Sequence, residues 1–274
     1  MKYGISFTGI HELGQRPGQE DSLYPAVGSK DPGNGLFIVC DGMGGHDKGE
    51  VASAAVCKAM SEYVNASAPK DGTFAEDDFK AALSAAYDAL DALDDGSYKK
   101  MGTTMTFLKF HDRGCLIAHI GDSRIYHIRP SAARGSRIMH VTRDHSLVND
   151  LVAIGELTPE QAKVSKQKNI ITRAMQPCQE RRARADVRQL DDVRPGDVFY
   201  MCTDGMLEQM EDSQIEEILS DATMSDEQKA QKLVSLTECN KDNHSAYIIT
   251  VAEGSRSRVG SWFSSIKSIF NSNK

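Results

Sequence analysis

The chain has 274 residues, of which 40% are hydrophobic and 26% are charged, a composition typical of a soluble globular protein and a length typical of one large domain. Its net charge of −7 argues against a general nucleic-acid binder. No apolar run approaches the roughly 20 residues that span a bilayer, and the start of the chain lacks the pattern of a signal peptide. The six cysteines show no C-x-x-C spacing, so reduced thiols in a cytoplasmic protein are expected.

Apolar periodicity predicts the secondary structure in chain order. Helices are expected at 50–64, 75–93, 212–220 and 226–239. Strands are expected at 103–110, 115–120, 124–128, 137–142, 184–190, 197–202 and 245–252. The short separations between the first four strands predict antiparallel neighbours rather than crossovers. The segment 144–177 is irregular and partly helical. Because strands and helices do not alternate regularly, the order predicts an α+β fold.

The last segment, 254–274, differs in kind from the rest of the chain. It has four basic residues and no acidic one, and five large apolar residues fall on one helical stripe. This pattern predicts an amphipathic tail that docks on a partner or a membrane surface. A terminal helix packed on its own domain is the alternative.

Three apolar runs end on an aspartate. The stretch FIVCDGMGGH places Asp41 after a buried run and follows it with three glycines. In FYMCTDG an apolar run likewise precedes Asp204, and in IGDSRIY an apolar run precedes Asp122. The glycines after Asp41 would let backbone or ligand approach that carboxylate closely.

Further acidic residues extend the pattern. Asp242 precedes the last apolar run, and Glu20 and Asp21 lie shortly after Arg16. Carboxylates gathered at one edge of a sheet repel one another unless a cation neutralises them, and oxygen ligands select Mg²⁺ or Mn²⁺ over zinc. Taken alone, each aspartate is better explained as a turn or cap residue.

Other phosphate chemistries fit the sequence less well. A Walker loop and a dinucleotide-binding loop counted from Gly42 both fail at Asp47, where each needs glycine. The C-x₅-R spacing of cysteine phosphatases occurs from Cys178 to Arg184. Its interior lacks the glycines that such a loop needs, so this interpretation is disfavoured.

Eight short motifs follow one another along the chain: RPGQED, VCDGMGGH, MGTTM, GDSR, DHSLV, TRAM, CTDG and DNHS. Together they closely resemble the successive motifs of the metal-dependent (PPM-type, type 2C) serine/threonine protein phosphatases, most of all the compact bacterial members. The resemblance covers residues from about 4 to 252. It implies two antiparallel β-sheets packed face to face with helices on both outer sides. Residues 1–253 would form the catalytic domain, with a flap at about 144–177, followed by the 254–274 tail.

The resemblance also implies roles for individual residues. Asp41, Asp204 and Asp242 would hold a first Mn²⁺ or Mg²⁺ ion. Asp41 and the Gly42 carbonyl, with Glu20 acting through water, would hold a second ion, so that Asp41 bridges the two.

Three further roles follow from the same resemblance. Asp21 would orient bound waters, and Arg16 would bind the substrate phosphate, for which its planar fork is suited. Asp122, together with Asp204, would supply a third, weaker metal site.

The implied reaction is hydrolysis of phosphoserine and phosphothreonine in proteins by a metal-activated water, without a phosphoenzyme, opposing a bacterial serine/threonine kinase. The alternative is a catalytically silent, phosphatase-like binding scaffold. Three departures from the family pattern stand out. Met43 stands where some relatives have a histidine that is a proposed general acid. A metal-bound water would then protonate the leaving oxygen instead, and His46 is a weak candidate for which a surface or turn role is favoured. The flap reads KVSKQKN, and His244 and Ser245 stand where an apolar residue and threonine are usual.

Overall fold

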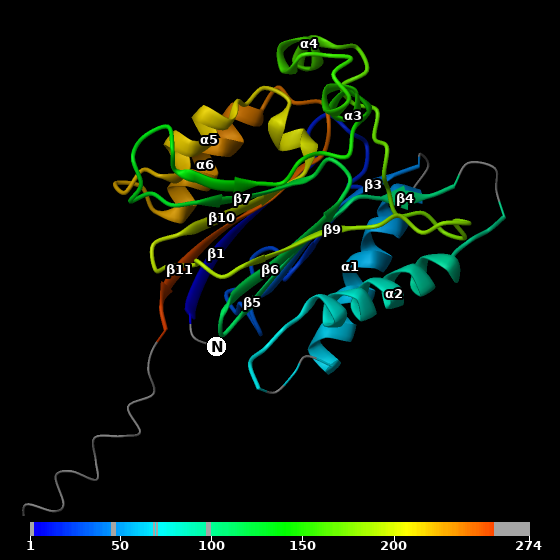
Figure 1. Ribbon diagram of the computed structural model, residues 1–274, viewed down its shortest axis with the longest axis horizontal. Coiled ribbons are helices and arrows are strands. Elements are labelled where there is room, and N and C mark those ends of the chain that lie inside the picture. The colour runs from blue at the N-terminus through cyan, green and yellow to red at the C-terminus, as the bar shows by residue number, and fades with distance from the viewer. Residues whose placement is uncertain (1–2, 45–47, 68, 70, 97–99, 255–274) are drawn as a thin grey trace, which may run out of the picture.

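The structure is a computed structural model, and it describes residues 3–44, 48–67, 69, 71–96 and 100–254 (Figure 1). His46 and the proposed tail beyond residue 254 lie outside the described residues. Among the helices that are described, none is both long and apolar enough to cross a membrane.

Two antiparallel sheets form the centre of the molecule. The first sheet contains, in order, β1 (Tyr3–Glu12), β11 (His244–Glu253), β10 (Val198–Cys202), β7 (Arg124–Ile128) and β8 (Ile138–Val141). The second contains β2 (Asp21–Tyr24), β3 (Leu36–Met43), β5 (Met105–His111), β6 (Gly114–Ile120) and β9 (Asp186–Leu190), with β4 (Gly102–Thr103) paired to β3.

Helices cover the outer face of each sheet (Figure 1). The helices α1 (Lys48–Ser67) and α2 (Glu76–Asp91) pack on the second sheet, and α5 (Asp212–Leu219) and α6 (Asp226–Thr237) pack on the first. Two short helices, α3 (Leu147–Ala153) and α4 (Pro159–Val164), lie in the flap. The predicted four-layer α-β-β-α sandwich is therefore confirmed.

The apolar runs are continuous because their strands are buried on both faces. In β3, Leu36, Ile38 and Cys40 pack in the cluster under α1 and α2, whereas Phe37 and Val39 face the other sheet. The same alternation divides the residues of β10 between the helices and the space between the sheets. A strand of this kind leaves the core only at its ends, which is where the aspartates stand.

The predicted helices and strands are confirmed, with differences of a few residues at their ends, but one expected neighbour relation is wrong. The strands at 115–120 and 124–128 do not pair, since β6 belongs to the second sheet and β7 to the first. The chain crosses between the sheets at Gly121–Ser123, where Gly121 takes a φ of 106° that favours glycine. This crossing carries Asp122 to the site.

Candidate active site

Asp41 stands at the end of β3, beside a second carboxylate. It lies directly opposite Asp21 in the β2–β3 register. Its N–H donates to Thr104 Oγ1 at 3.0 Å, and the Thr104 N–H donates to its carbonyl oxygen at 2.8 Å. These two hydrogen bonds with Thr104 fix the backbone of Asp41 and therefore the position from which its side chain extends.

Gly42 is a point of close backbone approach. A Cβ at this position would lie 2.1 Å from the carbonyl oxygen of Gly49 and 2.5 Å from that of Glu20. The Gly42 N–H also donates to the Glu20 carbonyl oxygen at 3.0 Å. The glycine after Asp41 is therefore required, because it lets the start of α1 and the loop before β2 pack against the site.

The other predicted acidic residues come from the first sheet and from the crossing between the sheets. Asp204 lies one residue beyond the end of β10 and starts a 3₁₀ turn, and Asp242 lies just before β11. Arg16 Nη2 donates to Asp242 Oδ2 at 2.7 Å, while Arg16 Nη1 lies 3.7 Å from Glu20 Oε2. The structure thus brings the predicted site residues together at one end of the sandwich.

Burial and mutual repulsion of the carboxylates dominate the electrostatics of the acidic cluster. Burial and the charges of neighbouring aspartates raise the pKa of Asp204 to about 6, of Asp21 to about 7 and of Asp122 to about 8. The same two causes raise the pKa of Asp41 well above its ordinary range. Each of Asp21, Asp122 and Asp204 has a buried Oδ1 with no hydrogen-bond partner among the described residues. These orphaned oxygens fit a divalent cation with a preference for hard oxygen ligands.

Two residues that sequence reasoning missed hold the site in place. Asn243 accepts a hydrogen bond from the Glu20 N–H at 2.8 Å and donates to the carbonyl oxygens of Leu13 and Gly18 at 2.8 and 3.0 Å. It thereby ties down the loop that carries Arg16. The only signal for its role is its position next to Asp242 in the DNHS motif.

Thr203, next to Asp204, also holds the site in place through hydrogen bonds. Its Oγ1 donates to Asp21 Oδ2 at 3.1 Å and accepts from the Ser245 N–H at 3.0 Å. It links the two sheets at the site. His244 is buried, and its Nδ1 lies 3.0 Å from the Asp242 carbonyl oxygen.

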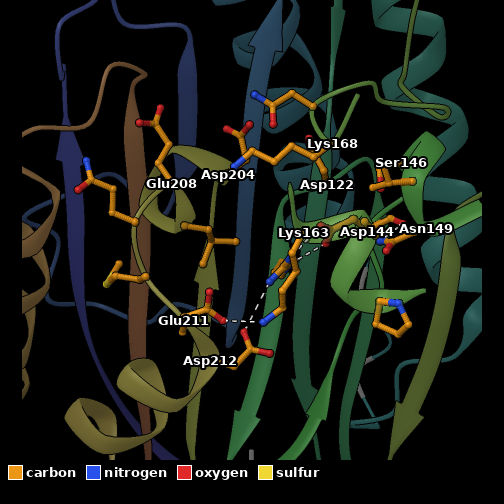
Figure 2. Close-up of a pocket in the computed structure, with 18 of the residues that line it drawn as sticks. Asp122, Asp144, Ser146, Asn149, Lys163, Lys168, Asp204, Glu208, Glu211 and Asp212 are labelled. Atoms are coloured by element: carbon orange, nitrogen blue, oxygen red, sulfur yellow. Dashed lines mark hydrogen bonds and ion pairs between the residues drawn. The ribbon is translucent and has the colours of Figure 1, made fainter. Parts of the chain in front are cut away.

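A cleft of about 750 Å³ leads away from the acidic cluster (Figure 2). Asp122 and Asp204 line one end, and the flap forms a wall on the side of Lys163 and Lys168. Lys163 Nζ bridges the cleft to Glu211 Oε2 at 2.8 Å. The apolar part of the lining consists of Val148, Val152, Pro159, Ala162, Leu207 and Met210. A cleft of this shape can receive a peptide segment next to the carboxylates.

The described residues around Cys178 do not form a comparable site for the cysteine alternative. Cys178 is exposed, and its N–H donates to Asp91 Oδ1 instead of turning towards an anion. Arg182, in the same segment, is paired with Asp88 and Asp91. A loop whose donors are satisfied by carboxylates does not cradle a phosphate.

Comparison with known proteins decides the family. The model of the protein phosphatase 2C family matches residues 15–238. The chain belongs to the protein phosphatase 2C family. The protein phosphatase PhpP of Streptococcus pneumoniae is 34% identical over 206 residues, which cover 71% of this chain and 76% of PhpP. The serine/threonine phosphatase PstP of Mycobacterium tuberculosis is 32% identical over 206 residues, covering 74% of this chain and 36% of PstP. This phosphatase 2C chain is accordingly a protein serine/threonine phosphatase.

Solved structures agree with this assignment. The PstP structure from M. tuberculosis superimposes with a TM-score of 0.74 at 28% identity, covering 90% of this chain and 99% of that one. Stp1 from Staphylococcus aureus gives a TM-score of 0.75 at 27% identity, covering 93% and 98%. A second PstP structure, in complex with two manganese ions, gives a TM-score of 0.71 at 28% identity, covering 90% and 98%.

Proposed function

We propose that this phosphatase 2C protein binds two divalent cations, Mn²⁺ or Mg²⁺, between its sheets. Asp41, Asp204 and Asp242 would hold one ion, and Asp41, the Gly42 carbonyl and Glu20 the other. The observation that carries this proposal is a set of buried carboxylate oxygens near Asp41, on Asp21, Asp122 and Asp204, that have no hydrogen-bond partner among the described residues. Burial and the charges of neighbouring aspartates raise the pKa of Asp41, and a cation bound there would stabilise its charged form. A third, weaker ion would be held by Asp122 together with Asp204.

Bound at these residues, Mn²⁺ or Mg²⁺ would supply an activated water for the hydrolysis of phosphoserine or phosphothreonine. The protein's own residues then have positioning tasks. Arg16 is the candidate for binding the phosphate, because its side chain is 46% exposed and a guanidinium can present two N–H groups to a phosphate. Asp21, held by Thr203, would orient water beside Asp41. The cleft would exclude bulk solvent from the phosphorylated segment of the substrate.

The substrates are phosphorylated proteins, and we infer further that the enzyme opposes a serine/threonine kinase in the cytoplasm of a bacterium. The PhpP, PstP and Stp relatives, all bacterial, support this inference. The basic, amphipathic composition of 254–274 supports docking of the tail on a partner or membrane surface. The silent scaffold is disfavoured, since such a scaffold is expected to lack metal ligands and every matched acidic residue is present here.

The direct test is hydrolysis of a phosphothreonine peptide by the purified protein. Activity should appear with Mn²⁺, disappear with EDTA, and be absent in Asp41→Ala with either. Asp77→Ala, at a side chain that is 93% exposed, serves as the control and should match the wild type. Activity that survives both EDTA and Asp41→Ala would refute the assignment, and inactivity of the wild type with Mn²⁺ would favour the scaffold.

A further inference from the structure

β9 is an edge strand of the second sheet. Within the described chain it pairs only with β6, and its residues Asp186, Arg188 and Gln189 are exposed. The outer edge of such a strand offers backbone N–H and C=O groups that no neighbouring strand uses. An extended segment of another chain can therefore be added to the sheet at β9, with hydrogen bonds between the two backbones.

One face of this edge carries a row of charged side chains. Ala185 and Val187 pack against the apolar cluster beneath α1 and α2. The alternate residues Arg184, Asp186 and Arg188 are exposed, as expected for side chains that point to the opposite face of a strand. Neither arginine forms an ion pair with another described residue, so both charges are available to an anionic side chain.

The acidic residue of this row is already paired. Arg173 Nη1 lies 2.8 Å from Asp186 Oδ1, and His145 Nε2 lies 3.3 Å from Asp186 Oδ2. The positive charge also reaches the edge strand of the other sheet, because burial and the charge of Arg188 lower the pKa of His140 in β8. Since the chain as a whole has a net charge of −7, this face is a local exception that favours an anionic partner.

The opposite face of the same edge opens into a cavity of about 340 Å³. Val187 lines it from β9, together with the apolar side chains of Leu116 and Phe74. The charged residues of its lining are Glu76, Arg113 and Asp191. An apolar side chain fits such a cavity, whereas an acidic one would meet two carboxylates and one guanidinium.

Protection of the edge against aggregation is the simpler explanation of the arginines. Protection needs charge alone, however, and it does not call for an apolar cavity on the other face of the same strand. The two faces of β9 together fit a strand with acidic side chains on one face and apolar side chains on the other. That combination points to a ligand.

We propose that the β9 edge, defined by Arg184, Val187 and Arg188, docks an extended segment of the phosphoprotein substrate in which acidic and apolar residues alternate. A guest strand beside β9 would place its acidic side chains next to the two arginines, at the spacing of cross-strand pairs. Its apolar side chains would lie on the face of Val187 and enter the cavity. The inference rests on the proposed function, because it takes the partner to be a substrate of the enzyme.

The β9 edge lies close enough to the active site for both to bind one substrate molecule. Asp186 is opposite His119, which precedes Asp122 by three residues in the chain. Three residues of strand span about 10 Å, and the step from β9 to β6 adds about 5 Å. A linker of six residues, which spans up to about 20 Å, therefore connects a docked strand with a phosphothreonine near Asp122.

The first test measures binding alone, in EDTA, by fluorescence anisotropy. The probe is a labelled peptide of alternating glutamate and valine, EVEVEVE. The matched peptides are QVQVQVQ, which lacks the charge, and EEEEVVV, which keeps the charge and composition but not the alternation. The arginine variant combines Arg184→Glu with Arg188→Glu. The lysine variant combines Lys58→Glu with Lys232→Glu, at exposed positions of α1 and α6, and has the same change in net charge.

We expect the wild type to bind EVEVEVE about 10-fold or more tightly than either matched peptide, as two exposed charge pairs allow. The lysine variant should keep this preference and the arginine variant should lose it. Arg184→Gln with Arg188→Gln replaces the arginine variant if the latter shows no cooperative melt. Equal binding of EVEVEVE and EEEEVVV, or no binding of either, would overturn docking as a strand. A preference that survives in the arginine variant would overturn docking at β9.

The second test measures hydrolysis with Mn²⁺. A phosphothreonine peptide is joined to EVEVEVE or QVQVQVQ through six glycine and serine residues, in both orders, because a guest strand can run either way along β9. In one order the acidic extension should lower KM by about 10-fold and leave kcat unchanged, as expected for added binding that is equal in the ground and transition states. The arginine variant should lose this gain and should hydrolyse the unextended peptide like the wild type.

The two tests separate the β9 edge from the proposed function. Binding of EVEVEVE without a gain in KM in either order would overturn the docking of substrate there. A wild type that hydrolyses no phosphopeptide with Mn²⁺ would contradict the proposed function, while the binding measured in EDTA still decides whether β9 receives an acidic strand.

Discussion

Replacing Asp204 by asparagine should stabilise the metal-free protein while abolishing its response to metal. Burial and the neighbouring Asp242 raise the pKa of Asp204 from 3.8 to about 6. A group whose pKa is higher in the folded state contributes stability below its unfolded pKa and loses it as the pH rises through the folded value. At pH 8 this difference of about two pKa units costs up to about 3 kcal/mol in the free energy of unfolding. A neutral asparagine of the same shape avoids that cost.

The assay is thermal unfolding in EDTA at pH 4 and pH 8, and at pH 8 with Mn²⁺. For a chain of this size, about 3 kcal/mol corresponds to a rise in Tm of roughly 6–12 °C, the upper limit expected for Asp204→Asn at pH 8. Near pH 4, where Asp204 is largely protonated when folded, the variant and wild type should melt together.

Mn²⁺ at 100 times its Kd should add about 2.7 kcal/mol to the wild type and far less to the variant. The exposed variant Asp77→Asn should follow the wild type under every condition. If Asp204→Asn were equally destabilised at both pH values in EDTA, the ionised Asp204 carboxylate would not destabilise the metal-free fold. That result would refute the prediction.

Three further predictions concern residues that position the metal-binding aspartates or bind the phosphate. Gly42→Ala places a methyl group 2.1 Å from a backbone oxygen of α1, so we expect about 1–3 kcal/mol of destabilisation and weaker Mn²⁺ binding, measured by melting and metal titration. Arg16→Lys keeps the charge but loses the fork, and kcat/KM for a phosphopeptide should fall roughly 10–100-fold; an unchanged value would exclude phosphate binding by Arg16. Thr104→Val leaves the Asp41 N–H without its acceptor, which should cost about 1–3 kcal/mol and lower kcat, whereas the buried control Thr106→Val should lose stability without a comparable loss of kcat.

The parts of the site that lie at the ends of apolar runs could be predicted from the sequence. A run such as that before Asp41 is buried on both faces, so the first acidic residue after it must stand at the edge of the core. The same reasoning placed Asp204 and Asp122. The family motifs then supplied roles that no single run could give.

The crossing at Gly121–Ser123 could not be predicted in the same way. A three-residue connection between two strands is equally compatible with a hairpin and with a change of sheet. The choice depends on the packing of Gly121 against Thr104 and on the bonds to His145, which are contacts between distant segments. β1 was missed for a related reason, since its residues alternate weakly and its partner is at the other end of the described chain.

The pairing of β1 with β11 determines when, during synthesis on the ribosome, the domain can finish folding. Within the described chain β1 pairs only with β11, and Tyr3 lies opposite Glu253. At typical rates of bacterial translation the ribosome needs on the order of 10–50 seconds between these two residues. Asn243, which anchors the loop of Arg16 and Glu20, also emerges long after that loop, since 223 residues separate it from Glu20. The nascent chain is therefore expected to stay catalytically inert, with its first strand unpaired and exposed to chaperones, until synthesis of the domain is almost complete.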